Sequence, residues 1–195
     1  MKPYIGRCLK AAPIVAVAAY LALSMHSGRP IRNLPAGLDF KNGDVLVLGS
    51  STLRGRLLKC LDFGTSWAHA GIVAVEPSGQ VVLMHADPQR GAVEEPLDKY
   101  LKDWSVDALC LMRPKSGDGD IAARCARGII AANPPFDDSF RYGEGEGIYC
   151  TELALLAWNA AGSEIVPGVS KGEKVMPSRL ATSPALVKVW EILSP

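Results

Sequence analysis

Residues 67–75 have the sequence WAHAGIVAV, and this stretch, with the turn and the apolar run behind it, decides the fold. Its small and β-branched residues are typical of a strand. Residues 76–79, EPSG, have the composition of a turn, and residues 81–85 predict a second strand. We therefore expect an antiparallel hairpin, whose register can bring the side chains of His69 and His85 together.

Further strands and helices are predicted on both sides of this hairpin. Continuous apolar runs predict short strands, and apolar residues at helical spacing predict helices. The predicted strands span residues 45–48 and 106–112, and the predicted helices span residues 50–62, 96–104, 121–132 and 149–161. In the first of these helices, the apolar residues on one side are Leu53, Leu57, Leu58 and Leu61. Strict alternation of strands and helices is absent, so the pattern indicates an α+β domain.

Length and composition bound the class of protein. The chain has 195 residues, of which 48% are hydrophobic, so it is long enough for one domain with a real core and too apolar for wholesale disorder. Lys and Arg number 21 against 20 Asp and Glu, which gives a net charge of +1. Near-neutral charge without aromatic residues interleaved among basic ones argues against nucleic acid as a partner.

The N-terminal part differs in composition from the rest. Basic residues precede an uncharged, mostly apolar run over residues 11–25, which is the layout of a secretory signal and is short for a spanning helix. We expect residues 1–26 to be a signal peptide or a membrane anchor, with a buried core helix as the alternative. Residues 27–40 then form a linker, and residues 41–195 form the domain. Export would make the domain periplasmic, secreted or associated with a membrane through its N-terminal segment.

One cysteine has a position that suits chemistry. Cys150 lies in the first turn of the helix predicted over residues 149–161, where free backbone N–H groups and the helix dipole favour negative charge. We therefore expect a lowered thiol pKa and a thiolate at Cys150. The chain has five cysteines and no Cys-x-x-Cys pair, which excludes a zinc ribbon or a thioredoxin-type motif.

Cys150, His69 and His85 have the residue types of a cysteine hydrolase. Such an enzyme needs a thiolate, a base beside it and a group that holds the base. His69 would accept the thiol proton, and His85 would bind the far nitrogen of His69 and fix its tautomer. The structural alternatives are a buried thiol, a hydrogen-bonded sheet histidine and a polar strand end.

No metal or other cofactor is expected. A zinc site built from His69, His85 and Cys150 is conceivable, but their spacing matches no local zinc motif. The glycines at positions 143, 145 and 147 do not have the spacing of a dinucleotide-binding loop, and no strand precedes them.

The chain resembles a known family over roughly residues 40–180. The matching pieces are GDV at 43–45, WAHAGIV at 67–73, the strand that ends at His85, GAV to PL over 91–97, and IYCTEL at 148–153. With the histidine first and the cysteine late, these pieces are similar to the permuted NlpC-type, papain-like cysteine hydrolases, in their YiiX/YebB-like branch. Lecithin:retinol acyltransferase-like proteins are related to this branch.

The resemblance implies a fold and a set of roles. The fold is a small antiparallel sheet packed against helices, with the nucleophile at a helix N-terminus. Cys150 is implied as the nucleophile and His69 as the base, while His85 matches a third position where relatives often carry glutamate. Tyr149 is expected to line the substrate site, with a core aromatic residue as the alternative.

The function expected from the residues and the resemblance is a thiol hydrolase. It would cleave amide or ester bonds of a cell-envelope substrate, such as a cell-wall peptide or a lipid-like acyl compound, through an acyl-enzyme. An acyltransferase using the same cysteine and a non-catalytic envelope binding module are the alternatives.

Overall fold

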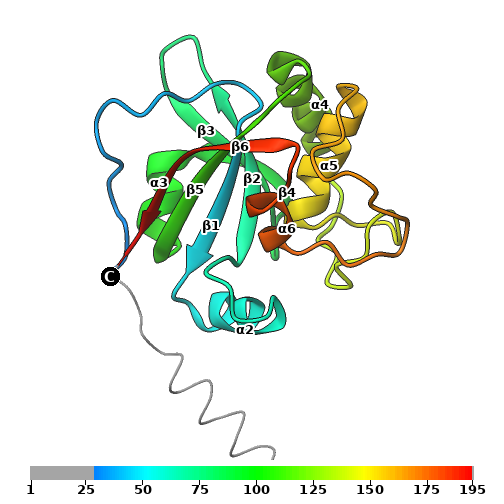
Figure 1. The fold of residues 1–195 in the computed structure, drawn as a ribbon, viewed down its shortest axis with the longest axis horizontal. Helices are drawn as coiled ribbons and strands as arrows, with labels where there is room; N and C mark the ends of the chain where they lie inside the picture. Colours follow the sequence, from blue (N-terminus) through cyan, green and yellow to red (C-terminus); the bar gives the residue numbers. More distant parts are fainter. Residues whose placement is uncertain (1–28, 195) are drawn as a thin grey trace, which may run out of the picture.

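The computed structural model describes residues 29–194, which build an α+β fold around a six-stranded antiparallel sheet (Figure 1). The strand order is β4-β3-β2-β1-β5-β6. The strands are β1 (Val45–Ser50), β2 (His69–Val75), β3 (Val81–Asp87), β4 (Gly91–Pro96), β5 (Val106–Pro114) and β6 (Leu186–Leu193). The helices are α2 (Leu53–Leu61), α3 (Leu97–Asp103), α4 (Gly119–Ala131), α5 (Cys150–Ala160) and α6 (Pro177–Ala181).

The elements predicted from the sequence are present, and three more accompany them. The hairpin of β2 and β3, the strands β1 and β5, and the helices α2 to α5 all fall within the predicted ranges to a few residues. Strands β4 and β6 and helix α6 were not predicted. Both additional strands lie at the edges of the sheet, and each pairs with one neighbour only.

The apolar run over residues 11–25 lies outside the described residues. Within residues 29–194, no helix is both long and apolar enough to cross a membrane. Part of the predicted linker packs against the sheet: the backbone N–H of Ile31 donates to the carbonyl of Val106, and Leu34 and Phe40 contact the same side of the core.

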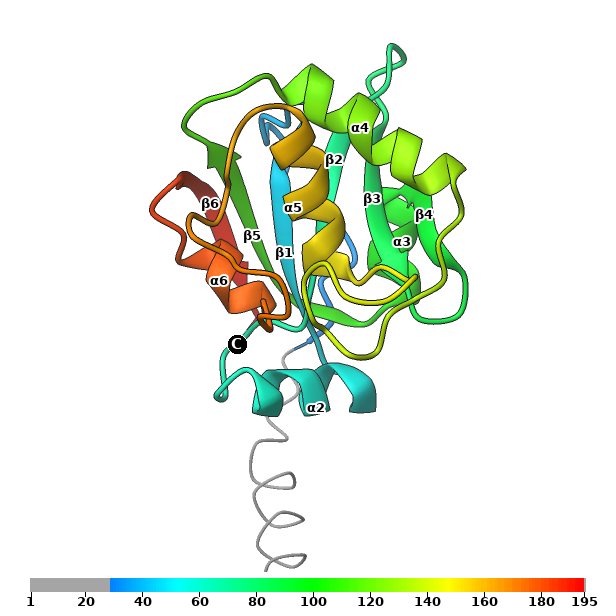
Figure 2. The ribbon, with the colours of Figure 1, turned by 90° about the vertical axis from the view of Figure 1, so that its right-hand side faces the viewer.

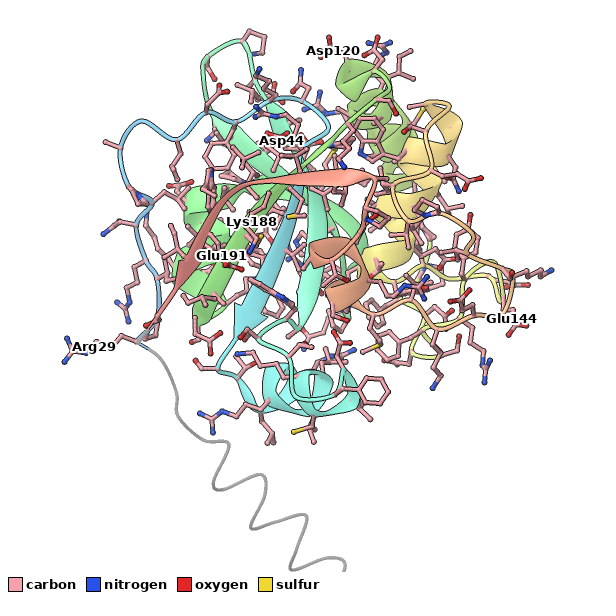
Figure 3. All side chains as sticks on the ribbon, viewed as in Figure 1. Arg29, Asp44, Asp120, Glu144, Lys188 and Glu191 are labelled. Atoms are coloured by element: carbon pink, nitrogen blue, oxygen red, sulfur yellow. The ribbon has the colours of Figure 1, made fainter. Side chains whose placement is uncertain are left out.

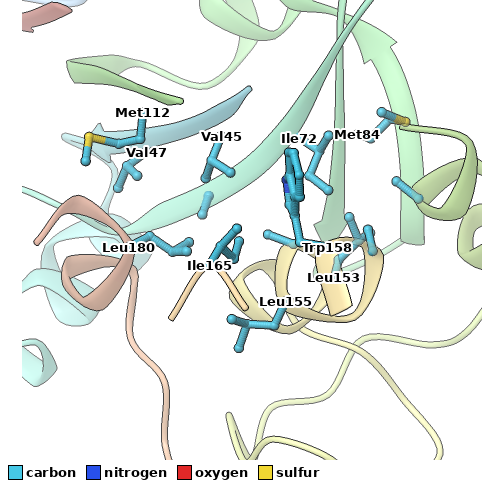
Figure 4. Packing of buried hydrophobic residues seen from close by; sticks show 14 of the residues in the cluster. Val45, Val47, Ile72, Met84, Met112, Leu153, Leu155, Trp158, Ile165 and Leu180 are labelled. Atoms are coloured by element: carbon cyan, nitrogen blue, oxygen red, sulfur yellow. The ribbon is translucent and has the colours of Figure 1, made fainter. Parts of the chain in front are cut away.

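Helices cover both faces of the sheet. Figure 2 shows α4 and α5 in front of the strands, with α3 behind them. The core under α5 is formed by alternate residues of the central strands, such as Val45 and Ile72, which pack against Leu153 and Trp158 of that helix (Figure 4). The opposite face packs against α3 through the other set of alternating residues, as the two-residue period of a strand requires.

Two tight contacts fix the start of β1. Gly43 has a φ of 81°, and a Cβ there would lie 2.5 Å from the Cα of Gly119, so only glycine fits. Next to it, the buried carboxylate of Asp44 accepts hydrogen bonds of 2.8 Å from both Nε and Nη2 of Arg113. Asp44, labelled in Figure 3, is therefore a structural acceptor.

Helix α2 lies beyond the ends of the strands, at one end of the molecule (Figures 1 and 2). Thr52 caps it, since Thr52 Oγ1 accepts a hydrogen bond from the N–H of Gly55. Apolar residues at helical spacing usually face a core, but Leu53, Leu57 and Leu61 are exposed here.

Candidate functional site

The hairpin brings His69 and His85 into contact, as the sequence predicts. His69 is the first residue of β2, and His85 lies near the end of β3. The register of the two strands pairs Ile72 with Met84, so His69 and His85 are diagonal neighbours on the face that α3 covers. Nε2 of His69 lies 3.1 Å from Nδ1 of His85, and the two rings meet edge to face.

A carboxylate that the sequence analysis missed completes this chain of polar groups. Strand β4 pairs Val93 with His85, which places Glu95 diagonally across from His85 on the same face of the sheet. Oε1 of Glu95 lies 2.9 Å from Nε2 of His85 and also accepts a 2.8 Å hydrogen bond from Nη2 of Arg90. The hydrogen bond from His85, opposed by burial and supported by Arg90, lowers the pKa of Glu95 to about 2.

The ionised Glu95 sets the direction of the hydrogen bonds. A carboxylate only accepts, so Nε2 of His85 must donate to it. In a neutral His85, Nδ1 is then the acceptor, and it accepts a hydrogen bond from the N–H at Nε2 of His69. A neutral His69 consequently has its lone pair on Nδ1, the nitrogen that faces away from His85 and makes no hydrogen bond within residues 29–194.

The ring of Tyr100 packs against both imidazoles. The ring of Tyr100, on α3, stacks on His69 with an interplanar angle of 11° and meets His85 edge to face. Beside these rings is a small pocket of about 60 Å³. Its wall includes His69, His85 and Tyr100, residues of α2, and residues next to β2, β3 and α3; the last two groups are Arg54, Gly55 and Leu58, and Ala68, Pro88 and Trp104.

Cys150 lies at the first position of α5, as the sequence predicts, but its side chain is buried. Only 4% of the residue is exposed, and it does not line the pocket. Its sulfur is close to the backbone N–H of Ala70, the residue after His69, and lies 3.9 Å from Oγ1 of Thr151. The thiol therefore rests against the start of β2.

Within residues 29–194, Cys150 and His69 make no hydrogen bond to each other, yet they share neighbours. Burial raises the pKa of Tyr100, whose ring stacks on His69, and negative charge on Cys150 would raise it further. Because the sulfur contacts the N–H of Ala70, and His69 is the first residue of β2, the thiol and the imidazole belong to the same end of that strand.

The prediction of a thiolate at Cys150 is wrong for the protein at rest. Burial raises the pKa of this thiol and outweighs the backbone N–H groups of Ala70, Thr151 and Cys150 itself. Burial also lowers the pKa of His69 well below its usual value, and the neighbouring His85 lowers it further. The resting pair is therefore a neutral thiol and a neutral imidazole.

Tyr149 and Glu152 flank Cys150 inside the protein. Tyr149 is 1% exposed, packs edge to face against Phe140 and does not line the pocket, which favours the core alternative. Glu152 accepts a 2.7 Å hydrogen bond from the N–H of Gly143, so it anchors the glycine-rich segment that precedes α5. Burial raises the pKa of its carboxyl group.

Fold and site together define an α+β protein in which a histidine pair on a β-meander lies close to the start of a cysteine-bearing helix. The metalloprotein YiiX from Escherichia coli O157:H7 has this fold: its crystal structure matches with a TM-score of 0.62 at 16% sequence identity, over 78% of this chain and 98% of that one. The sequence matches no protein-family model and no curated protein. The YiiX-like fold expected from the sequence is thus confirmed.

Proposed function

We propose that this protein is a thiol hydrolase of the permuted NlpC-type, papain-like class, which cleaves an amide or ester bond with Cys150 as nucleophile and His69 as base. The observation that carries the proposal is the run of hydrogen bonds from Glu95 through His85 to His69. These hydrogen bonds leave the lone pair of a neutral His69 on Nδ1, at the start of β2, where the sulfur of Cys150 also lies.

The neutral resting pair indicates how the proton moves. Nδ1 of His69 takes the thiol proton while the sulfur of Cys150 bonds to the carbonyl carbon of the substrate. Backbone N–H groups at the start of α5 and at Ala70 stabilise the negative oxygen. His69 then gives the proton to the leaving amine or alcohol, the carbon–leaving-group bond breaks, and the acyl group stays on sulfur.

Hydrolysis of the acyl-enzyme reuses the same groups. Nδ1 of His69 takes a proton from water as the water oxygen attacks the thioester carbon, and the proton returns to the departing sulfur. His85 and Glu95 keep the lone pair of His69 on Nδ1 throughout.

The substrate proposed is an amide or ester of the cell envelope, either a cell-wall peptide or a lipid-like acyl compound. The basic and apolar composition of residues 1–25 supports an exported protein that is periplasmic, secreted or attached to a membrane. The near-neutral net charge continues to argue against nucleic acid.

The described residues do not fit a metal centre, although YiiX, which has a similar fold, is called a metalloprotein. Between residues 29 and 194, no group of three or more His, Cys, Asp or Glu side chains is arranged to hold a metal ion. Both ring nitrogens that His85 could offer are already engaged, one by His69 and one by Glu95. The proposed mechanism accordingly contains no metal-dependent step.

Mass mapping of acyl adducts tests the proposal. The full chain is incubated with envelope lipids or peptidoglycan fragments, quenched in acid and digested. We expect an acyl group on Cys150, and none in Cys150→Ala; Cys110→Ala, which removes a buried thiol inside β5, should keep the adduct. Transfer to an added amine in place of water would identify an acyltransferase. An unmodified Cys150 with all substrates would favour a non-catalytic binding module.

A further inference from the structure

Helix α2 and its end present an apolar surface that nothing in the described part of the chain covers. Leu53, Leu57 and Leu61 follow one another at four-residue spacing and are 73%, 44% and 67% exposed. Phe63, which comes just after the helix, is 98% exposed. We call these four residues the α2 patch. Single exposed apolar side chains are ordinary, but a contiguous group of large ones marks an interaction surface.

We propose that the α2 patch docks on the interfacial region of a lipid bilayer. The aromatic residue of the patch, Phe63, supports this occupant. Phe63 has a φ of 56°, in the left-handed region that large side chains rarely adopt. The ring of Phe63 is almost fully exposed, so no burial within the protein offsets the cost of this backbone conformation. Immersion in the headgroup and upper acyl region would bury the ring.

Charge around the patch suits lipid headgroups. Helix α2 has no acidic residue in its sequence, and it carries Arg54, Arg56 and Lys59. Lys59 is paired with Asp107 and Arg54 with Asp138, while Arg56 makes no ion pair with any residue between 29 and 194. An apolar face with a basic flank is the pattern of helices that lie in a bilayer interface, where anionic lipids strengthen binding.

The course of the chain points to the same end of the molecule. Arg29, where the described chain begins, lies at the end of the protein where α2 lies (Figures 1 and 3). The sequence just before it contains the uncharged run over residues 11–25. If that run contacts a bilayer, the domain is held with α2 toward the lipid.

A second copy of the chain fits the patch less well. Stable protein interfaces bury about 800 Å² on each partner and involve some 20–30 residues a side. Four side chains from one short helix and its end supply far less, whereas insertion into a bilayer needs no complementary protein surface.

Docking would place the pocket close to lipid. Arg54, Gly55 and Leu58 of α2 line the pocket beside His69, so the same helix carries the patch and part of the pocket wall. The binding step itself does not depend on Cys150 reacting, and it can be measured without turnover.

A tryptophan in the patch gives a local readout in the full chain. Phe63→Trp is mixed with vesicles of phosphatidylcholine and phosphatidylglycerol that carry bromine on the acyl chains, which quench indole fluorescence on contact. We expect quenching and a blue shift for Phe63→Trp. Gln80→Trp, in the exposed turn between β2 and β3 at the other end of the molecule, is the matched control and should show no added quenching relative to the native tryptophans.

Removal of the apolar side chains tests the energetics. Leu57→Ser with Phe63→Ser should weaken vesicle binding by about 100-fold, since burying each side chain of this size favours the bound state by about tenfold. Val187→Ser with Leu193→Ser, which removes exposed apolar groups from β6, should leave binding unchanged. Circular dichroism confirms that both double variants are folded.

Three results would overturn the proposal. Vesicle binding without quenching of Phe63→Trp would mean that another part of the chain attaches the protein. A blue shift before lipid is added, lost on removal of residues 1–26, would mean that the protein's own N-terminal segment covers the patch. Concentration-dependent dimerisation abolished by Leu57→Ser with Phe63→Ser would assign the patch to a second copy.

Discussion

Oε1 of Glu95 lies 2.9 Å from Nε2 of His85, on the side of that ring opposite to His69. The two residues come from neighbouring strands of one meander, and both are buried. His85 is therefore the middle member of a hydrogen-bonded series, called the relay below, that runs from Glu95 through His85 to His69. His85 thus lies between the imidazole of His69 and a buried carboxylate.

Glu95→Gln should slow acylation of Cys150 by about 100-fold, because an amide can donate to Nε2 of His85 and so stabilise the tautomers that block Nδ1 of His69. The measurement is p-nitrophenolate release from p-nitrophenyl acetate, with the acetyl group mapped to Cys150. Glu94→Gln is the control, since Glu94 is the preceding residue of the same strand and pairs with Arg127. Equal rates for Glu95→Gln and the parent would refute the relay.

Alkylation of Cys150 by iodoacetamide should follow a raised pKa, because burial favours the neutral thiol. We expect slow labelling at pH 7 that increases up to and beyond pH 9, as measured by peptide mass spectrometry. Cys60, a partly exposed thiol in the same chain, serves as the internal reference. A labelling rate at Cys150 that is already maximal below pH 7 would contradict the neutral resting pair.

The stability of the protein should fall as the pH is lowered through 6.5. The pKa of His69 is lowered in the folded state, so the unfolded chain binds the proton first and acid favours unfolding. His69→Gln removes this contribution and should flatten the dependence between pH 6.5 and 5 by up to about 1 kcal/mol per pH unit. Urea denaturation at several pH values measures it. Parallel curves for the two proteins would show that His69 titrates normally in the fold.

Tyr100→Ala should destabilise the fold by about 3–5 kcal/mol, because it removes a buried ring that packs between α3 and both histidines. Tyr100→Phe keeps the ring and should cost less than about 1 kcal/mol. Chemical denaturation gives the two values. If Tyr100→Phe were as destabilising as Tyr100→Ala, the hydroxyl rather than the ring would be the stabilising group.

Asp44→Asn should lower stability by about 3 kcal/mol, because it leaves the guanidinium of Arg113 without its buried anionic partner. Asp44 lies in the turn before β1, away from the histidine pair, so the alkylation profile of Cys150 should not change. A loss of Cys150 reactivity without a loss of stability would assign Asp44 a role in the site.

The central strands could be predicted from the sequence because their local pattern and their final environment agree. β1 and β2 are continuous apolar runs, and both are buried on two faces. Strand β4 could not be read in this way, because its sequence GAVEEP contains adjacent glutamates and a proline. It is a strand because it pairs with β3 at the edge of the sheet, and the pairing that makes it a strand also delivers Glu95 to His85.

The sequence predicted the contact of the two histidines and the helix position of Cys150, but not Glu95 or the effect of burial on the thiol. The order of elements was enough to bring His69 and His85 together, and helical spacing placed Cys150 at the start of α5. The predicted thiolate at Cys150 is absent because burial of the side chain raises the pKa of the thiol by more than the nearby backbone N–H groups lower it.

Strand β6 was not predicted, although its sequence LVKVWEIL is rich in β-forming residues.

The meander of β2, β3 and β4 holds the whole relay within residues 69–95, whereas the sulfur arrives with a helix much later in the chain. During synthesis, the segment that carries the imidazoles leaves the ribosome well before the segment that carries the thiol. The two histidines and Cys150 therefore lie at one end of β2 only once α5 has docked, and a nascent or truncated chain that ends before residue 150 holds the imidazoles without the thiol.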